Sequence, residues 1–136
     1  MKSKLIDTNI IVRFLVEDVK ENKHYKIIFD LFEQVEKKEI LISIEPVVVA
    51  ETFFVLTKFY EIPRDEVCRK LIDILGFSGV QITNKNVAIK VLERLMKKKI
   101  DFVDSYLIEL ALDRGMSIFT ADKDLIKSEA ETEKLY

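Results

Sequence analysis

The chain has 136 residues, of which 49% are hydrophobic and 34% are charged, and this balance fits one compact domain over residues 1–136. Its formal net charge of −2 argues against a generic nucleic-acid binder, so a polyanionic substrate would need a local basic patch or a metal ion. A lone cysteine, Cys68, excludes an internal disulfide and a multi-cysteine zinc site. The chain contains no run of 18 apolar residues, and no charged-then-apolar leader precedes the first strand pattern. We therefore expect a soluble, unexported, cytoplasmic protein.

Short apolar segments alternate with helical patterns along residues 4–97. Strands are predicted at Lys4–Ile6, Ile40–Ile42 and Val80–Ile82. The helices are expected over residues 10–15, 24–37, 46–60, 63–75 and 84–97, with a polar break at 18–22 and with caps at Thr8 or Asn9, at Ser43, and at Thr83 or Asn84. This alternation is typical of an α/β protein with a parallel sheet and helices on both faces, a three-layer α/β/α arrangement.

The stretch from Asp101 to Asp124 reads as helix, tight turn, strand and second helix. Asp101 can cap the first helix, Gly115 can end it, and Asp122 can cap the second helix after a short buried strand at residues 117–120. The region after it, residues 128–136, is charged and shows no strand pattern.

Asp104 and Asp122 should lie at the same end of this helix–strand pair, because the strand runs antiparallel to the helix. The ten helical residues after Asp104 cover about 15 Å, and the five extended residues that end at Asp122 cover roughly 16 Å in the opposite direction. That end is the carboxyl end of the strand, where open α/β sheets place their ligand-binding and active sites. Two carboxylates that meet there repel each other unless a cation or a proton lies between them.

Two further acids are candidates for the same site. Asp7 lies just past the first strand, and Glu51 lies about five residues into the helix that follows the second strand, among apolar neighbours. We expect Glu51 to be buried and therefore to need a partner. Hard oxygen ligands of this kind suit Mg²⁺ or Mn²⁺, and a metal bound by them would activate a water for attack on a phosphodiester.

Each acid also has an ordinary structural explanation. Asp101 and Asp104 would form a capping-box arrangement, Asp7 would be a turn residue, and Asp122 would only cap its helix. Glu51 would extend to solvent from a helix surface. The other polar side chains favour structural roles, since His24 is alone and Cys68 and Ser105 have no base nearby in the sequence, and Lys97–Lys99 is either a solvated helix end or a contact to a nucleic-acid backbone.

Three segments together resemble the motifs of PIN-domain proteins of the VapC toxin type. They are LIDTNIIVRFLVED from Leu5, ISIEPVVVAETFFVLTKFYEI with Glu51, and DFVDSYLIELALDRGMSIFTADKDL with Asp104 and Thr120-x-Asp122. They occur in the family's order, from Leu5 to about Leu125. The resemblance implies a PIN-like fold with a central twisted parallel sheet of four or five strands, although residues 128–136 do not look like the further strand that the family often has.

The resemblance also implies a function and roles for the residues. The function is an Mg²⁺- or Mn²⁺-dependent endoribonuclease that hydrolyses RNA, is usually a homodimer, and is silenced as a toxin by a cognate antitoxin. The catalytic metal ligands or their immediate supports would be Asp7, Glu51, Asp104 and Asp122. Thr8, Asn9 and Thr120 would orient carboxylates or water, with Asp101 assisting.

Other functions stay open at this stage. The chain could be a catalytically idle PIN-like binding or scaffold module, or a nuclease in RNA processing without an antitoxin. A phosphoryl-accepting receiver domain ranks low, because such a domain needs paired acids near the first strand and Asp7 stands alone.

Two surfaces are candidates for contact with other molecules. Arg13 lies four residues after Asn9, on the same helix face, and its guanidinium suits phosphate, although it could instead pair with Glu17. The helix at residues 46–60 has more apolar side chains than one small domain can cover. We therefore expect it to contact a second copy of the chain, an antitoxin helix, or both. The alternative is that the helix at residues 64–75 covers the surplus.

Overall fold

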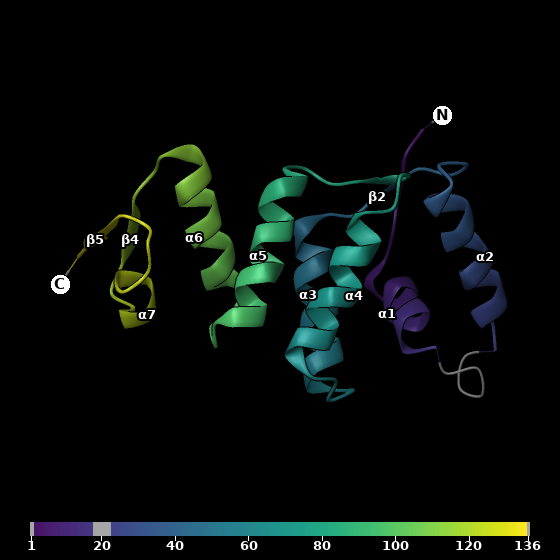
Figure 1. Cartoon of the computed structure of the whole chain (residues 1–136), viewed down its shortest axis with the longest axis horizontal. Helices are drawn as coiled ribbons and strands as arrows, with labels where there is room; N and C mark the ends of the chain where they lie inside the picture. The colour runs from purple at the N-terminus through teal and green to yellow at the C-terminus, as the bar shows by residue number, and fades with distance from the viewer. Residues whose placement is uncertain (1, 18–22, 136) are drawn as a thin grey trace. The chain divides into compact units, whose positions relative to one another are not determined.

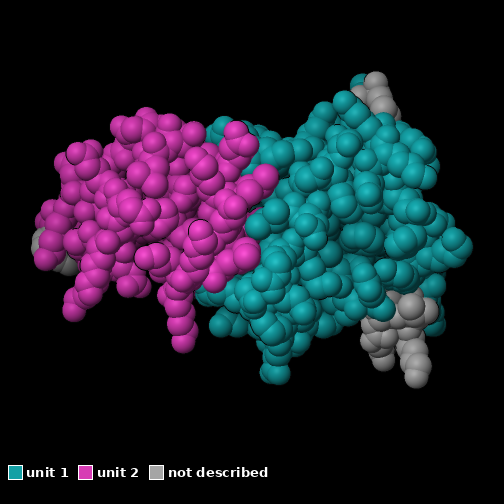
Figure 2. All heavy atoms as spheres, viewed as in Figure 1, with its two compact units in different colours: residues 1–85 teal, residues 86–136 magenta. Residues whose placement is uncertain are grey.

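The computed structural model describes residues 2–17 and 23–135 and divides into two compact units, residues 1–85 and 86–136 (Figure 2). The polar break that we predicted at residues 18–22 lies outside the described residues. The prediction of a single domain stays a prediction. Among the described residues, no helix is long and apolar enough to cross a membrane.

The first unit contains a parallel sheet and four helices (Figure 1). Its elements are β1 (Lys4–Leu5), α1 (Thr8–Val16), α2 (Tyr25–Glu36), β2 (Ile42–Ser43), α3 (Pro46–Lys58), α4 (Arg64–Leu75) and β3 (Val80–Gln81). The strands pair in the order β1-β2-β3, with Ile42 opposite both Lys4 and Val80. α1 packs against α2 and α3, and α3 packs against α4, so these helices bury part of the apolar surface that their periodicity predicted.

Gly79 fixes the entry to β3. Its N–H donates to the Val35 carbonyl at 2.8 Å, and its own carbonyl accepts from Ile42 N–H at 2.9 Å. A Cβ at this position would lie 2.3 Å from the Ile40 carbonyl oxygen, so only glycine fits between the end of α2 and the sheet. The sequence therefore needs glycine where the chain turns from α4 into the strand.

Two of the predicted helix caps are wrong. Asp7 rather than Thr8 or Asn9 holds the N-cap position of α1, because the backbone is still extended at Asp7 and becomes helical at Thr8. Ser43 belongs to β2, where its hydroxyl forms a hydrogen bond with the hydroxyl of Ser3, and Glu45 is the N-cap of α3. Pro46 occupies the first turn of α3 as predicted.

α3 keeps one apolar face exposed. Val47 and Phe54 lie on this face, and Phe54 is 55% exposed; Phe59 and Tyr60, just after the end of the helix, are exposed as well. Val49, Phe53 and Leu56 are buried. The alternative that α4 covers all the surplus apolar surface of this helix is therefore wrong.

The second unit contains α5 (Lys85–Lys97), which begins at the last residue of the first unit, and then α6 (Phe102–Arg114), β4 (Ile118–Thr120), α7 (Lys123–Ile126) and β5 (Thr132–Lys134). α6 ends at Gly115, whose φ of 63° is the left-handed conformation expected of a C-cap glycine. β4 and β5 are parallel, with Ile118 opposite Thr132.

Three expectations about the strands need correction. β5 lies in the segment that we expected to have no strand, because its three residues are polar and carry no apolar alternation. β4 is not fully buried, since Phe119 is 68% exposed. The single central sheet of four or five strands is not confirmed, because the described strands form one sheet of three and one of two.

Candidate active site

Asp104 is an acid of the second unit whose pKa is raised by its surroundings. It lies in the first turn of α6 and its side chain is partly buried. Burial raises the pKa of the Asp104 carboxyl above its usual range, and the negative charges of Asp122, Asp101 and Asp124 raise the pKa further. Asp104 and Asp122 therefore lie within electrostatic reach of each other, as the lengths of the helix and the strand predicted.

A small apolar core holds these acids together. Ile108 and Ala111 of α6, Ile118 of β4, Leu125 of α7 and Ala130 form one buried cluster. Ile108 is one helical turn after Asp104, and Leu125 is three residues after Asp122. Packing of this cluster therefore brings the first turns of α6 and α7 near each other.

Asp122 is held by its own turn. Its Oδ1 accepts hydrogen bonds from the N–H groups of Asp124 at 2.8 Å and Leu125 at 3.4 Å, so the predicted helix cap is confirmed. The Thr120 hydroxyl oxygen accepts from the Asp122 N–H at 2.9 Å. Thr120 thus supports the backbone of Asp122, and its predicted role in orienting a carboxylate or water stays a prediction.

Asp101 occupies the N-cap position of α6 as predicted, but its side chain makes no capping hydrogen bond. Its contribution is electrostatic, because its charge is one of those that raise the Asp104 pKa. Ser105, the next residue after Asp104, is fully buried, and its hydroxyl donates to the Val91 carbonyl of α5 at 2.9 Å. The structural role predicted for Ser105 is therefore confirmed.

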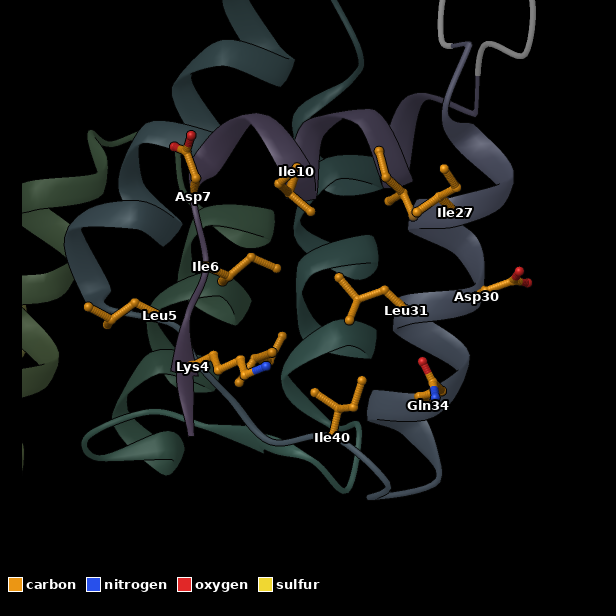
Figure 3. Close-up of a pocket in the computed structure, with 12 residues that line it drawn as sticks. Lys4, Leu5, Ile6, Asp7, Ile10, Ile27, Asp30, Leu31, Gln34 and Ile40 are labelled. Carbon is orange, nitrogen blue, oxygen red and sulfur yellow. The ribbon is translucent and has the colours of Figure 1, made fainter. Parts of the chain in front are cut away.

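Asp7 and Glu51 belong to the first unit. Asp7 follows β1, makes no capping bond to α1, and lies at one end of a pocket of about 680 Å³ that is lined mainly by aliphatic side chains. Figure 3 shows its carboxylate turned away from those side chains. That Asp7 joins Asp104 and Asp122 in one site stays a prediction.

The expected burial of Glu51 is wrong, because its side chain is exposed. It lies four residues after Val47 and three residues before Phe54, on the face of α3 that is apolar and exposed. Apolar neighbours therefore did not indicate burial here. Its role as a metal ligand or support stays a prediction.

The start of α1 carries the other polar residues of the first motif. Arg13 Nε donates to Asn9 Oδ1 at 3.3 Å, which confirms that the two side chains share one helix face. Thr8 is buried in the first turn. Asn9 thus contacts a cation of its own helix, and the predicted roles of Thr8 and Asn9 beside a carboxylate or water stay predictions.

A group that we did not predict connects three segments of the second unit. Arg94 of α5 binds Glu109 of α6 and Glu129, which lies between α7 and β5. Glu109 is only 7% exposed. The available signal was Glu109 itself, a charged residue between Ile108 and Leu110. The contacts could not be read from the sequence, because Arg94 lies 15 residues from Glu109 and 35 residues from Glu129.

The pattern of the PIN domain matches residues 4–130, which is nearly the whole chain. The chain belongs to the PIN domain family. PIN domains are in general nucleases that act on RNA and use divalent metals such as Mg²⁺. A comparison with curated proteins gave no match. The family resemblance is thus confirmed at the level of the PIN domain.

The acids of this PIN domain fit a divalent cation chemically. Within either unit, the described residues contain no group of three or more His, Cys, Asp or Glu side chains that could hold a metal. Asp104 still has a carboxyl group whose ionisation is opposed by burial and by three acidic neighbours. A hard dication offsets these terms, and carboxylate oxygens are the ligands that Mg²⁺ and Mn²⁺ prefer.

The substitution Asp104→Asn should stabilise the metal-free protein at neutral pH. Because the folded-state pKa of Asp104 is raised, the stability that this residue contributes is fully present below the ordinary Asp range and is lost as the pH rises through the folded-state pKa. The Asn variant does not titrate, so its Tm in EDTA should exceed that of the wild type by a few degrees at pH 7, and the difference should shrink toward pH 4.

Thermal unfolding across this pH range measures the effect. Glu93→Gln, which removes an exposed carboxylate from the middle of α5, is the control and should leave the Tm difference nearly independent of pH. A difference for Asp104→Asn that does not change with pH would contradict the electrostatic account.

Proposed function

We propose that this PIN domain is an Mg²⁺- or Mn²⁺-dependent endoribonuclease that hydrolyses RNA phosphodiester bonds. The observation that carries the proposal is the partly buried Asp104, whose pKa is raised by burial and by Asp122, Asp101 and Asp124. Such a group of like charges costs stability and has no structural purpose by itself, whereas it suits a cation site. Membership of a nuclease family supports the same function.

In this proposal Asp104 and Asp122 hold the metal, and Asp7 and Glu51 are further ligands or their supports. When bound, the metal supplies an activated water and neutralises charge on the phosphodiester. The chain itself fixes the ligands, since two backbone N–H groups hold Asp122 Oδ1 and the Ser105 hydroxyl anchors the start of α6 to α5. Because the Asp104 pKa is raised, protons compete with metal binding and activity should fall in acid.

We further propose that the enzyme is a toxin of the VapC type, a homodimer that a cognate antitoxin silences. The supporting observation is exposed apolar surface, with Val47 and Phe54 on one face of α3 and Phe59 and Tyr60 just after its end. Aromatic side chains anchor protein interfaces, and an amphipathic helix of an antitoxin fits a surface of this kind. An idle scaffold module and an RNA-processing nuclease without an antitoxin are the alternatives that the following experiments separate.

Asp104→Asn should abolish metal binding and catalysis while the protein stays folded. Calorimetric titration with Mn²⁺ should show binding to the wild type and none to the variant, and kcat on an RNA substrate should fall at least about 100-fold, because a ligand is lost. Asp113→Asn, at the other end of α6, is the control and should keep both properties.

Two outcomes would contradict the assignment. Equal Mn²⁺ binding by the wild type and Asp104→Asn would show that Asp104 is not a ligand. Mn²⁺ binding without cleavage of any RNA by the wild type would favour the scaffold module over the nuclease.

Arg13→Ala should lower kcat/KM for RNA about tenfold and reduce the salt dependence of binding by about one phosphate contact. Arg69→Ala is a matched control, because Arg69 is also an exposed helical arginine that contacts a residue four positions earlier, Asp65. Kinetics at several salt concentrations measure both effects. An unchanged kcat/KM in Arg13→Ala would exclude Arg13 as a substrate residue.

Phe54→Lys should convert the expected dimer to a monomer, since it places a charge in the exposed apolar face of α3. Phe119→Lys, which changes another exposed phenylalanine on β4, should leave the dimer intact. Light scattering at high micromolar concentration measures the oligomeric state. A wild-type protein that is strictly monomeric and does not bind any co-encoded partner would contradict the interface proposal.

A further inference from the structure

Arg94 makes the most extensive side-chain ion-pair network among the described residues. Its Nε and Nη2 contact Glu109 Oε2 at 2.8 and 2.7 Å. Its Nη1 and Nη2 donate to the two carboxylate oxygens of Glu129 at 3.2 and 2.7 Å, a bidentate arrangement. The three residues Arg94, Glu109 and Glu129 are called the Arg94 clamp below.

The clamp joins the segments that carry the two acids of the candidate site. Glu109 lies five residues after Asp104 on α6, about 7.5 Å along a rigid helix. Glu129 lies seven residues after Asp122, just beyond α7. Arg94 of α5 contacts both carboxylates at once, so one guanidinium group links α6 to the segment after α7.

Stability alone does not explain this network. A salt bridge taken out of water contributes little net stability, because desolvation offsets the attraction. The side chains of Arg94 and Glu109 are only 12% and 9% exposed, so they pay this cost. Ile108 of α6 and Leu125 of α7 already belong to one buried apolar cluster, which Ile118 of β4 shares. A planar guanidinium that binds two carboxylates adds a fixed direction and distance, which apolar packing does not supply.

The charged state of the clamp is secure. Hydrogen bonds to Glu129 and Glu109 raise the pKa of Arg94 although burial opposes them, and the hydrogen bond from Arg94 lowers the pKa of Glu129. The hydrogen bonds between Arg94 and Glu129 therefore favour the charged forms of both side chains.

We propose that Arg94 is a positioning residue of the active site, which sets the separation of Asp104 and Asp122 by binding Glu109 and Glu129. This inference rests on the proposed function, because it assigns a purpose to the spacing of the two proposed metal ligands. Arg94 itself touches neither acid in this role. It acts through α6 on Asp104 and through the segment after α7 on Asp122.

Two mild variants test the clamp. Arg94→Lys keeps the charge but loses the planar fork, and Glu129→Gln removes one partner that is mostly exposed. Each should weaken Mn²⁺ binding about tenfold in calorimetry, and the Mn²⁺ concentration for half-maximal RNA cleavage should rise by the same factor. Excess Mn²⁺ should restore most of kcat, since the ligands themselves remain.

The controls separate positioning from a merely structural role. Arg69→Lys and Asp65→Asn alter the exposed ion pair on α4 and should change neither Mn²⁺ affinity nor kcat. Ile74→Val, a buried substitution in α4, lowers stability without touching the clamp. If Glu129→Gln and Ile74→Val lower Tm by similar amounts and also weaken Mn²⁺ binding by similar amounts, the loss of affinity follows the loss of stability and the clamp has no positioning role.

A second measurement needs no metal. Nuclear Overhauser effects among the methyl groups of the buried cluster, Ile108, Ile118 and Leu125, report how α6, β4 and α7 pack, and they should weaken in Arg94→Lys and Glu129→Gln but not in Arg69→Lys. If these effects and the Mn²⁺ affinity are both unchanged, the inference is overturned. If the wild type binds no Mn²⁺, the proposed metal site fails, and the methyl contacts alone decide whether the clamp sets the spacing.

Discussion

Repulsion between Asp104 and Asp122 is the constraint on which the second unit depends. The charge of Asp122 raises the pKa of Asp104, and two such carboxylates separate unless the surrounding structure holds them. Three features oppose the separation: the apolar cluster of α6, β4 and α7, the backbone N–H groups that fix Asp122, and the Arg94 clamp. A metal-free protein built this way stores unfavourable electrostatic energy, and a bound dication releases it. If the proposed metal site is correct, the arrangement that lowers stability would also raise affinity for a cation.

The overall charge of the protein also calls for a bound cation, because the substrate is an anion. With a net charge of −2 and acids at its proposed site, the protein repels RNA at the point where cleavage has to occur. A dication bound at the proposed site would reverse the sign of the field locally, so metal binding and substrate binding would be cooperative. Arg13 then needs to contribute only one contact, and its hydrogen bond to Asn9 directs the guanidinium along α1.

Features set by local chemistry could be predicted from the sequence. Gly115 ends α6 in the left-handed conformation, Pro46 opens α3, and Asp122 caps α7, because each depends on residues within one turn. The return of Asp122 to Asp104 followed from two lengths. β5 was missed, since three polar residues carry too little pattern, and Glu51 was misjudged because the apolar face around it is exposed. The Arg94 clamp was missed because its partners lie far apart in the chain, and no local pattern indicates such a contact.

The exposure of Glu51 places a condition on any partner of α3. Val47, Glu51 and Phe54 lie along one face of the helix, so a protein that covers the two apolar side chains also takes the carboxylate out of water. An ionised carboxylate buried without a partner is strongly unfavourable. A bound antitoxin therefore has to supply a lysine or arginine opposite Glu51, or keep this position solvated at the rim. The first arrangement would pair a proposed ligand of the metal with a basic side chain, so partner binding and metal binding would oppose each other through one residue.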